Sequence, residues 1–263
     1  MTLSLITVCY NSETHIRSTI ESVLSQTYPD IEYIIIDGMS TDRTIDIIES
    51  YGNVRLKWIS EPDSGMYDAI NKGIRMATGE IVGILHSNDF YNNPQCLETV
   101  AGTFKDSTID ACFADVHFVK PDRLEKTVRY YSSARFKPSQ FRWGFMPAHP
   151  TFFARKRYFD EIGYYKTDYQ IAADFELLIR FLYTNKLKYK YIPLDMVTMR
   201  TGGKSTRSWK SNYILNKEIV RACKENGIYT NFFLLLLKYF RKVFELINMN
   251  NPQSERLNFT CFM

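Results

Sequence analysis

Cysteine is scarce in this sequence, and the few cysteines are not arranged to pair or to bind a metal. Five cysteines are scattered along 263 residues, and none forms a CxxC pair. This argues against a zinc knuckle and a disulfide framework and favours a reducing compartment. Long apolar runs are also missing, because no run reaches the about 18 to 20 residues that a membrane-spanning helix needs. The segment MTLSLITVCYNS has no charged start, so we interpret it as a buried first strand rather than a signal peptide.

Glycine-rich nucleotide-binding loops are missing as well. No GxGxxG motif follows a predicted strand, which excludes a dinucleotide-dependent oxidoreductase. The segment after the first strand, CYNSETHIRS, contains no glycine, whereas a sugar nucleotidyltransferase should carry a glycine-rich, basic loop there. The net charge is only +4, and basic residues alternate with aromatic ones only faintly, so we predict no nucleic-acid partner.

The first part of the chain alternates between strand and helix patterns. Apolar runs at 3–10, 31–36, 56–59 and 81–85 are separated by helical patterns that begin near residues 16, 43 and 66. This alternation predicts a single α/β domain with a mostly parallel central sheet flanked by helices. A further strand is predicted over 111–119, and helices over 175–183 and 213–224. Functional groups should gather at the carboxyl ends of the parallel strands.

Acidic residues recur at the predicted carboxyl edge of this sheet. Asp37, Asp63 and Asp89 each follow a predicted strand, and Asp174 opens a later helix. A single Asp in such a place is often a helix cap or a turn residue. Their recurrence along one edge indicates a functional site.

Longer motifs in the same order give a family resemblance. The segments ITVCYNSE, IIIDGMSTDRT and SEPDSGMYDAINKGIRMATGEIVGILHSNDF, then HPTFF and AADFELLIRF, resemble family 2 glycosyltransferases with the glycosyltransferase-A fold, in particular bacterial members that build surface polysaccharides. The resemblance implies a catalytic domain over 1–205, with a nucleotide-binding half at about 1–118 and an acceptor-binding half at about 119–205. Residues 206–263 would form a helical extension.

The resemblance also implies an activity. The chain would transfer a hexosyl or N-acetylhexosaminyl group, with inversion, from a nucleoside diphosphate sugar to an acceptor hydroxyl. A UDP-sugar is the favoured donor, and the acceptor would be a saccharide or lipid-linked saccharide in bacterial polysaccharide or glycolipid assembly. Two alternatives stay open: a non-catalytic sugar-nucleotide-binding or scaffold protein, and a sugar nucleotidyltransferase.

Several residues are candidates for binding the donor nucleotide. Asp37 could accept a hydrogen bond from the imide N–H of uracil, and Thr7 and Tyr10 could bracket that base, although Tyr10 could equally be a packing residue. In the family, the position of Asp63 helps to hold the base and ribose. Lys72 could reach the nucleotide, as the resemblance suggests, or pair with an acid one helical turn away.

Asp89 is the candidate metal ligand. It ends the triplet Ser87-Asn88-Asp89, where the family carries an acidic metal-binding motif. A hard cation such as Mg²⁺ or Mn²⁺ prefers oxygen ligands and would neutralise the diphosphate as it leaves. Asn88 stands where the family often has a second acid, so the metal would be bound through Asp89 and the donor phosphate. A turn formed by the Asn-Asp pair is the alternative.

Asp174 is the candidate catalytic base. The family's catalytic Asp opens this helix, and its carboxylate would take the proton of the attacking acceptor hydroxyl. An acid in the first turn also stabilises a helix on its own. Ala173 replaces the Glu that some relatives carry, and Glu176 is expected to face solvent. His149, in MPAHPTFF, is placed either near the acceptor or metal or as a structural hydrogen-bonding residue.

The C-terminal part adds three further hypotheses. Lys204 and Arg207 lie in the glycine-bearing segment TGGKSTR and could close over the diphosphate, or be solvated surface charges. Residues 231–247 combine apolar residues with four charges on one helical face, which suits a helix lying in a membrane interface. The alternative is a helix that packs on the catalytic domain or on a second subunit, giving a homodimer. We therefore predict a cytoplasmic protein that is peripheral at the inner face of the plasma membrane.

Overall fold

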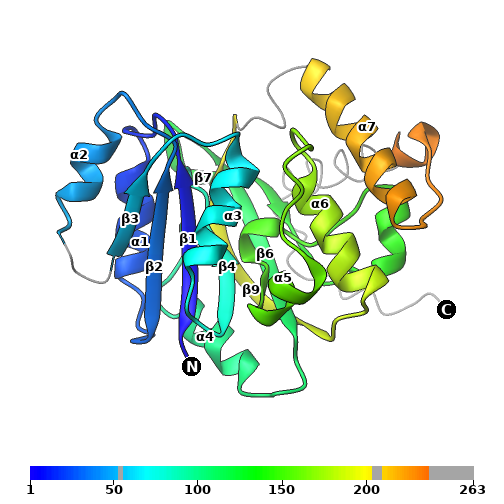
Figure 1. Cartoon of the computed structure of the whole chain (residues 1–263), viewed down its shortest axis with the longest axis horizontal. Coiled ribbons are helices and arrows are strands. Elements are labelled where there is room, and N and C mark those ends of the chain that lie inside the picture. The colour runs from blue at the N-terminus through cyan, green and yellow to red at the C-terminus, as the bar shows by residue number, and fades with distance from the viewer. Residues whose placement is uncertain (53–55, 203–208, 237–263) are drawn as a thin grey trace.

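The computed structural model of the chain describes residues 1–52, 56–202 and 209–236. Its first half is the predicted alternation of strands and helices (Figure 1). The elements are β1 (Leu3–Cys9), α1 (Ile16–Leu24), β2 (Ile31–Asp37), α2 (Thr44–Glu49), β3 (Leu56–Ser60), α3 (Met66–Met76) and β4 (Ile81–Ile84). The strands pair in parallel in the order β3-β2-β1-β4. The predicted parallel sheet is confirmed for this half.

Alternating side chains of β1 separate two cores, one on each face of the sheet. Ile6 and Val8 pack with α3 on one face, and Leu3 and Leu5 pack with α1 on the other. Because both faces are covered, the side chains of β1, β2 and β4 are mostly apolar and almost all buried, which is the usual pattern of parallel strands, whereas β3 at the edge of the sheet is only partly buried. The register aligns Cys9 with Asp37, so that the strands end along one edge.

The second half extends the sheet with mixed pairing. Beyond β4 the order continues β8-β6-β9-β5, and β7 pairs with β6. The contacts of β6 with β9 are parallel, whereas β8 is antiparallel to both β4 and β6. These elements are β5 (Asp89–Tyr91), α4 (Cys96–Phe104), β6 (Ala111–Lys120), β7 (Arg123–Tyr131), β8 (Phe153–Arg155), α5 (Arg157–Ile162), α6 (Ala173–Leu178) and β9 (Tyr189–Arg200), with the 3-10 helices η1 (Pro138–Trp143) and η2 (His149–Thr151).

Helix α6 and the segment after it replace the single predicted helix over 175–183. α6 continues as a π-helical segment, η3 (Ile179–Thr184). The expectation that Glu176 faces solvent is wrong. Glu176 is fully buried, and its carboxylate is paired with Arg180 at 2.8 Å and Lys166 at 2.8 Å. Arg180 in turn donates to three carbonyls of residues 162–164, so this acid holds a buried polar network together.

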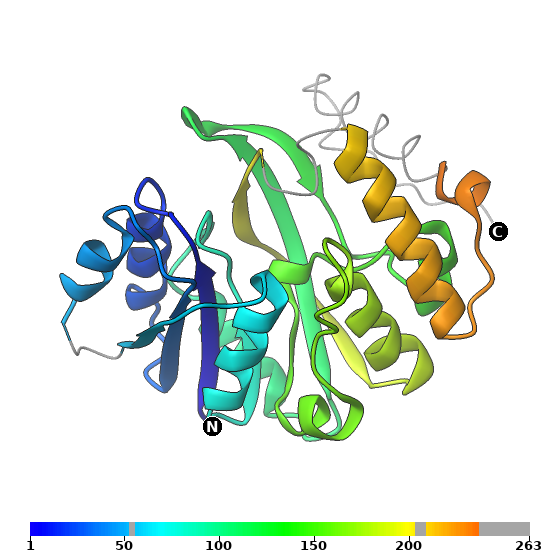
Figure 2. The same ribbon diagram turned by 45° about the horizontal axis from the view of Figure 1, so that its top comes forward.

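Helix α7 (Trp209–Glu225) lies beside α6 (Figure 2). It contributes Ile219, Ala222 and Cys223 to the same core as α3 and α6. The four cysteines of the described residues are buried and unpaired, as their spacing predicts. In the described part of the chain, no helix has the length and apolar character needed to cross a bilayer.

Candidate active site

The carboxyl edge of the parallel strands begins with Asp37, the last residue of β2. Its side chain is fully buried, and its two oxygens accept hydrogen bonds from Ser40 and Ser60. The Ser60 hydroxyl donates at 2.7 Å and the Ser40 N–H at 2.9 Å. Asp37 therefore joins the ends of β2 and β3, and its buried carboxylate is already engaged by these donors.

Tyr10 and Asp63 form the exposed part of this edge. Tyr10 is 62% exposed and follows β1, and Asp63 lies half-buried in the loop before α3. The two residues meet over Gly38, where an added Cβ would lie 2.5 Å from Asp63 Oδ2 and 3.6 Å from the Tyr10 ring. A glycine is required there for the loop to approach the end of β2. An aromatic face beside a carboxylate suits a nucleobase and its ribose.

Two other donor-site candidates have structural partners. Thr7 is fully buried in β1, and its hydroxyl accepts a hydrogen bond from Tyr33 at 3.1 Å, so the structure gives no support to its contact with a base. Lys72 bonds Glu61 at 2.9 Å and the carbonyl of Pro62 at 2.6 Å, with Asp68 at 3.9 Å. Lys72 therefore fixes the loop that carries Asp63.

Asp89 lies at the first position of β5, next to Arg200 on β9. Burial raises the pKa of Asp89 to about 7, and the charge and backbone N–H of Arg200 oppose this rise. The Arg200 guanidinium donates to the carbonyl of Asn88 at 2.7 Å and to Ser18 at 2.9 Å. Arg200, which the sequence analysis missed, thus ties the turn before Asp89 to β9 and α1. The side chain of Asn88 is exposed beside it.

The residues at Asp89 fit a hard cation only in part. Among the described residues, no group of three or more acidic, His or Cys side chains is placed to hold a metal ion. Asp89 supplies a carboxylate of the chemistry that Mg²⁺ and Mn²⁺ prefer, and water and the donor diphosphate would have to supply the other ligands. The binding of a metal through Asp89 and the donor phosphate therefore stays a prediction.

Asp174 lies in the first turn of α6 and is half-buried. Its Oδ1 accepts the backbone N–H of Phe175 at 2.8 Å. Burial raises the pKa of Asp174 to about 6. The N–H of Phe175 and the Tyr67 hydroxyl oppose this rise, and the charge of Glu218 adds to it. A carboxylate with its pKa moved towards neutrality is a better proton acceptor than an ordinary one.

A row of polar aromatic residues connects the β4 end to Asp174. The rings of His86 and His149 lie 5.8 Å apart, and His149 Nε2 bonds the Tyr165 hydroxyl at 2.7 Å. Tyr165 stacks on Tyr67 at 5.9 Å, and the Tyr67 hydroxyl donates to the carbonyl of residue 171, just before α6. The row places Asp174 beside the start of α3, next to the loop of Asp63. His149 is buried, its hydrogen bond to Tyr165 lies within the second half of the chain, and its ring contact with His86 joins that half to the first.

If Asp174 is the catalytic base, as the sequence predicts, turnover should have a specific pH dependence. Because the base must be ionised to accept a proton, we expect kcat to rise with pH through about 6 and then level off. Burial lowers the pKa of His86 to about 4 and that of His149 to about 3, so both are neutral in this range. Measurement at saturating donor and Mn²⁺ would keep Asp89 ionised if Asp89 is the metal ligand, as predicted. A rate that stays flat from about pH 5 to pH 8 would contradict this role of Asp174.

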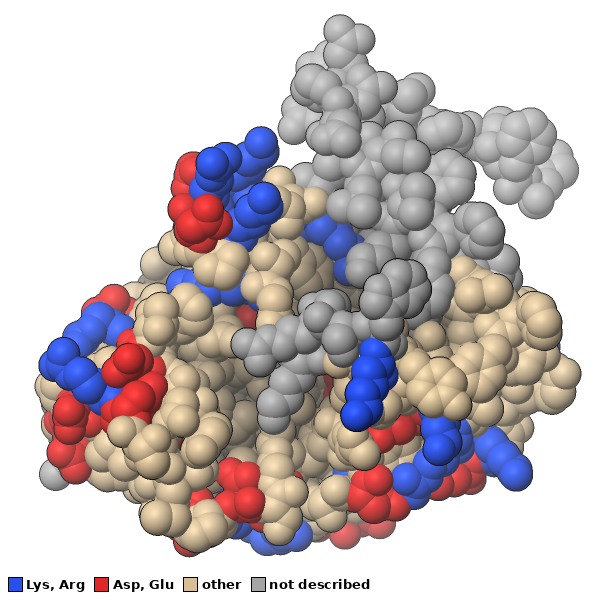
Figure 3. Space-filling view, turned by 90° about the horizontal axis from the view of Figure 1, so that it is seen from above, with Lys and Arg blue, Asp and Glu red and all other residues tan. Residues whose placement is uncertain are grey.

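Three C-terminal hypotheses fall wholly or partly outside the described residues. Lys204 and Arg207 are not described, and residues 231–247 are described only as far as 236. In the described portion, Phe232, Phe233 and Leu236 are exposed, whereas Leu235 is buried. The membrane helix therefore stays a prediction. Seen from above, the described part of this face of the molecule carries charges of both signs (Figure 3).

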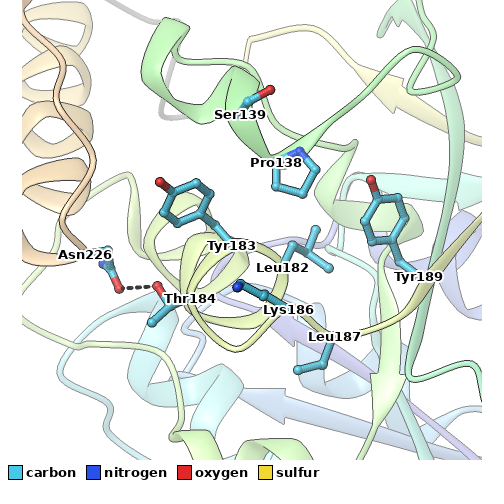
Figure 4. Close-up of a pocket in the computed structure, with 9 residues that line it drawn as sticks. All are labelled: Pro138, Ser139, Leu182, Tyr183, Thr184, Lys186, Leu187, Tyr189 and Asn226. Carbon is cyan, nitrogen blue, oxygen red and sulfur yellow. Dashed lines mark hydrogen bonds between the residues drawn. The ribbon is translucent and has the colours of Figure 1, made fainter.

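A cavity of about 580 Å³ lies away from the candidate site residues. Figure 4 shows Tyr183 and Tyr189 on its wall, with Lys186 between them. None of the candidate site residues lines it, so volume alone does not locate the chemistry in this fold.

The comparisons with known proteins agree with this fold. The chain matches the family described as "Glycosyl transferase family 2" over residues 4–187. It is 32% identical over 186 residues to an uncharacterized glycosyltransferase of Mycobacterium tuberculosis strain H37Rv, covering 68% of each chain. It is 27% identical over 232 residues to a PGL/p-HBAD biosynthesis glycosyltransferase of Mycobacterium bovis strain BCG, covering 83% of this chain and 82% of the relative.

Solved structures of low sequence identity share the fold. S. aureus TarS 1-349 in complex with UDP-GlcNAc has a TM-score of 0.67 at 21% identity, over 87% of this chain and 68% of that one. A mannosyltransferase from Pyrobaculum calidifontis, in complex with GDP-Man and Mn²⁺, has a TM-score of 0.59 at 16% identity, over 93% and 80%. The protein is thus a glycosyltransferase with the glycosyltransferase-A fold. It belongs to glycosyl transferase family 2.

Proposed function

We propose that this enzyme transfers a hexosyl or N-acetylhexosaminyl group, with inversion, from a UDP-sugar to a hydroxyl of a saccharide or lipid-linked saccharide. The observation that carries the proposal is Asp174. It is a half-buried carboxylate with a raised pKa, held at the start of α6 beside the loop of Asp63. This is the place where a general base could meet an acceptor next to a bound donor.

The proposed reaction is a single displacement. Asp174 takes the proton of the acceptor hydroxyl while the hydroxyl oxygen attacks the anomeric carbon. The bond from that carbon to the diphosphate breaks, and the diphosphate leaves. Asp89 would hold Mg²⁺ or Mn²⁺, which supplies positive charge for the diphosphate when bound. Tyr10 and Asp63 would hold the base and ribose. Because Asp37 is engaged by two serines, Asp63 is the carboxylate more accessible to the nucleobase of the donor.

Inversion is supported by the partners of the other acids near Asp174. Glu176 is paired with Arg180 and Lys166, and Glu218 accepts three backbone N–H groups. Neither carboxylate is free to act as a nucleophile, so a double displacement has no evident second group among the described residues near Asp174.

A UDP-sugar is favoured by the likeness to TarS, whose structures include complexes with UDP and UDP-GlcNAc. The relative from M. bovis is named for PGL/p-HBAD biosynthesis, which supports a role in glycolipid or polysaccharide assembly. We further propose a peripheral, cytoplasmic enzyme at the inner face of the plasma membrane. Co-sedimentation of the full chain with anionic but not neutral vesicles tests that location.

The expected stereochemical result is a β-linked product from an α-linked UDP-sugar. The enzyme is incubated with UDP-hexoses and UDP-N-acetylhexosamines, Mn²⁺ and saccharide acceptors, and the new anomeric proton is observed by NMR. GDP-sugars serve as the matched control for the identity of the nucleobase. Formation of an α-linked product would refute the single displacement, and transfer only from GDP-sugars would refute the choice of uridine.

A further inference from the structure

We propose that Glu218, on helix α7, is a positioning residue for the catalytic base: it fixes the backbone segment 170–172 from which α6 and Asp174 begin. The inference rests on the proposed function, because it assigns Glu218 a role only if Asp174 is the base. It makes α7, from the predicted helical extension, a part of the machinery of the active site.

Three hydrogen bonds carry the proposal. The Glu218 carboxylate accepts the backbone N–H of Gln170 at 2.7 Å, of Ile171 at 2.9 Å and of Ala172 at 2.9 Å. The Glu218 side chain is only 8% exposed. Hydrogen bonds from backbone N–H groups to a buried carboxylate are stronger than those to a neutral acceptor. Loss of the carboxylate would leave three N–H groups without this acceptor in a largely buried place.

The same segment is held from the opposite side. The Tyr67 hydroxyl, in the first turn of α3, donates to the carbonyl of Ile171. The peptide groups around Ile171 are therefore fixed between α3 and α7, two elements on either side of the loop. Ala172 is the residue before α6, and Asp174 follows two residues later. A shift of this segment must move the Asp174 carboxylate with it.

Other side chains of α7 contact the same loop farther from the base. Glu225 pairs with Lys166 at 2.8 Å and accepts the Tyr169 hydroxyl at 2.9 Å. Arg221 pairs with both Glu225 and Asp168. These contacts dock α7 on the loop but involve none of the amides at 170–172. Glu225 is therefore a matched control for Glu218, since it is the same residue type on the same helix.

The electrostatic effect of Glu218 gives a signature that docking alone would not produce. The titratable groups that face Asp174 are Tyr67 from α3, Tyr165 from the loop before α6, and Glu218 from α7. After burial, which raises the pKa of Asp174 most, the charge of Glu218 raises it further, whereas the Tyr67 hydroxyl lowers it. Removing the charge of Glu218 should lower the pKa of the base, and Tyr67→Phe should raise it.

The experiment compares Glu218→Gln with Glu225→Gln. A glutamine has one acceptor oxygen, and its NH₂ group would face backbone donors. We expect kcat of Glu218→Gln to fall by about 10-fold to 10²-fold, the scale for a misplaced catalytic group, with the donor Kd unchanged. The acid limb of kcat should move to lower pH. Hydrogen exchange of the 170–172 amides should become faster. Glu225→Gln should lower thermal stability and leave the acid limb in place.

If Glu218→Gln does not fold, Glu218→Asp replaces it. The shorter side chain keeps the charge but would not extend to the 170–172 amides, so kcat should fall with little change in the acid limb of its pH profile. The inference would be overturned if the Glu218 variant had the kcat, the amide exchange rates and the pH profile of the wild-type enzyme. It would also be overturned if Glu225→Gln shifted the acid limb of the kcat profile as Glu218→Gln does. If wild-type protein transfers no sugar under any donor condition, the proposed function fails instead. The amide exchange rates then still decide whether Glu218 holds the segment.

Discussion

Asp174→Asn is expected to reduce kcat by about 10²-fold or more, the usual scale for loss of a general base. The amide keeps the shape of the side chain and an oxygen that can accept the N–H of Phe175, which the carboxylate accepts at 2.8 Å. Helix α6 should therefore start at the same place. What is lost is a group that can take a proton from the acceptor hydroxyl, so the loss should fall on turnover and not on donor affinity.

Single-turnover rates and calorimetric titration of the donor nucleotide measure these two quantities separately. Asp168→Asn is a suitable control, because Asp168 lies in the loop before α6 and pairs with Arg221 at the surface. It makes the same chemical change six residues away and should leave the rate near that of the wild-type enzyme. Wild-type turnover in Asp174→Asn would show that another group accepts the proton. A large loss of donor affinity would instead place Asp174 in the donor site.

Asp89→Ala is expected to weaken metal-dependent donor binding and to lower the rate together. Asp89 is the candidate carboxylate ligand on β5, and loss of a group that holds or orients a metal costs on the order of 10-fold to 10²-fold in metal affinity. In the presence of Mn²⁺, calorimetry should show weaker binding of the nucleotide to the variant. Without metal, the two proteins should bind it similarly. Chelation with EDTA should abolish transfer by the wild-type enzyme.

Asn88→Asp gives the opposite change at the neighbouring position. Asn88 is exposed, and it is the backbone carbonyl of Asn88, not its side chain, that bonds Arg200, so the substitution keeps that contact. A second carboxylate beside Asp89 should lower the Mn²⁺ concentration that gives half-maximal rate. Transfer that persists unchanged in EDTA would remove the metal from the proposal. An Asn88→Asp variant with unchanged metal dependence would place the cation elsewhere.

The sequence by itself determined the parallel half of the fold, and it predicted the edge at which we propose the site. Strands β1, β2 and β4 are covered on both faces, so their runs of apolar residues are nearly continuous and stand out locally. Asp37 is the last residue of β2, Asp63 lies in the loop after β3, and Asp89 comes after the turn that follows β4, because polar residues can be accommodated where a strand leaves the core. The opening of α6 by Asp174 was also visible from local pattern and family motif.

Apart from β6, which the sequence predicts over 111–119, only the tertiary structure decided the second half of the sheet. Strand β8 has three residues, too few to show a period. Strand β9 contains Pro193, which cannot donate to a ladder and reads as a strand breaker. It nevertheless pairs along both edges, with irregular register against β6 around Asp115. Such strands are specified by distant partners and not by their own residues.

The tertiary structure also decided which polar side chains are available to a ligand. In the sequence, Asp37 looked available to substrate and Glu176 to solvent. Both carboxylates are nevertheless buried and engaged, Asp37 by two serines and Glu176 by Arg180 and Lys166. Glu218 reaches amides 46 to 48 residues earlier in the chain. Hydrogen bonds over such separations depend on how α7 packs against the loop before α6. A sequence pattern, which reports neighbours within a few turns, carries no signal for them.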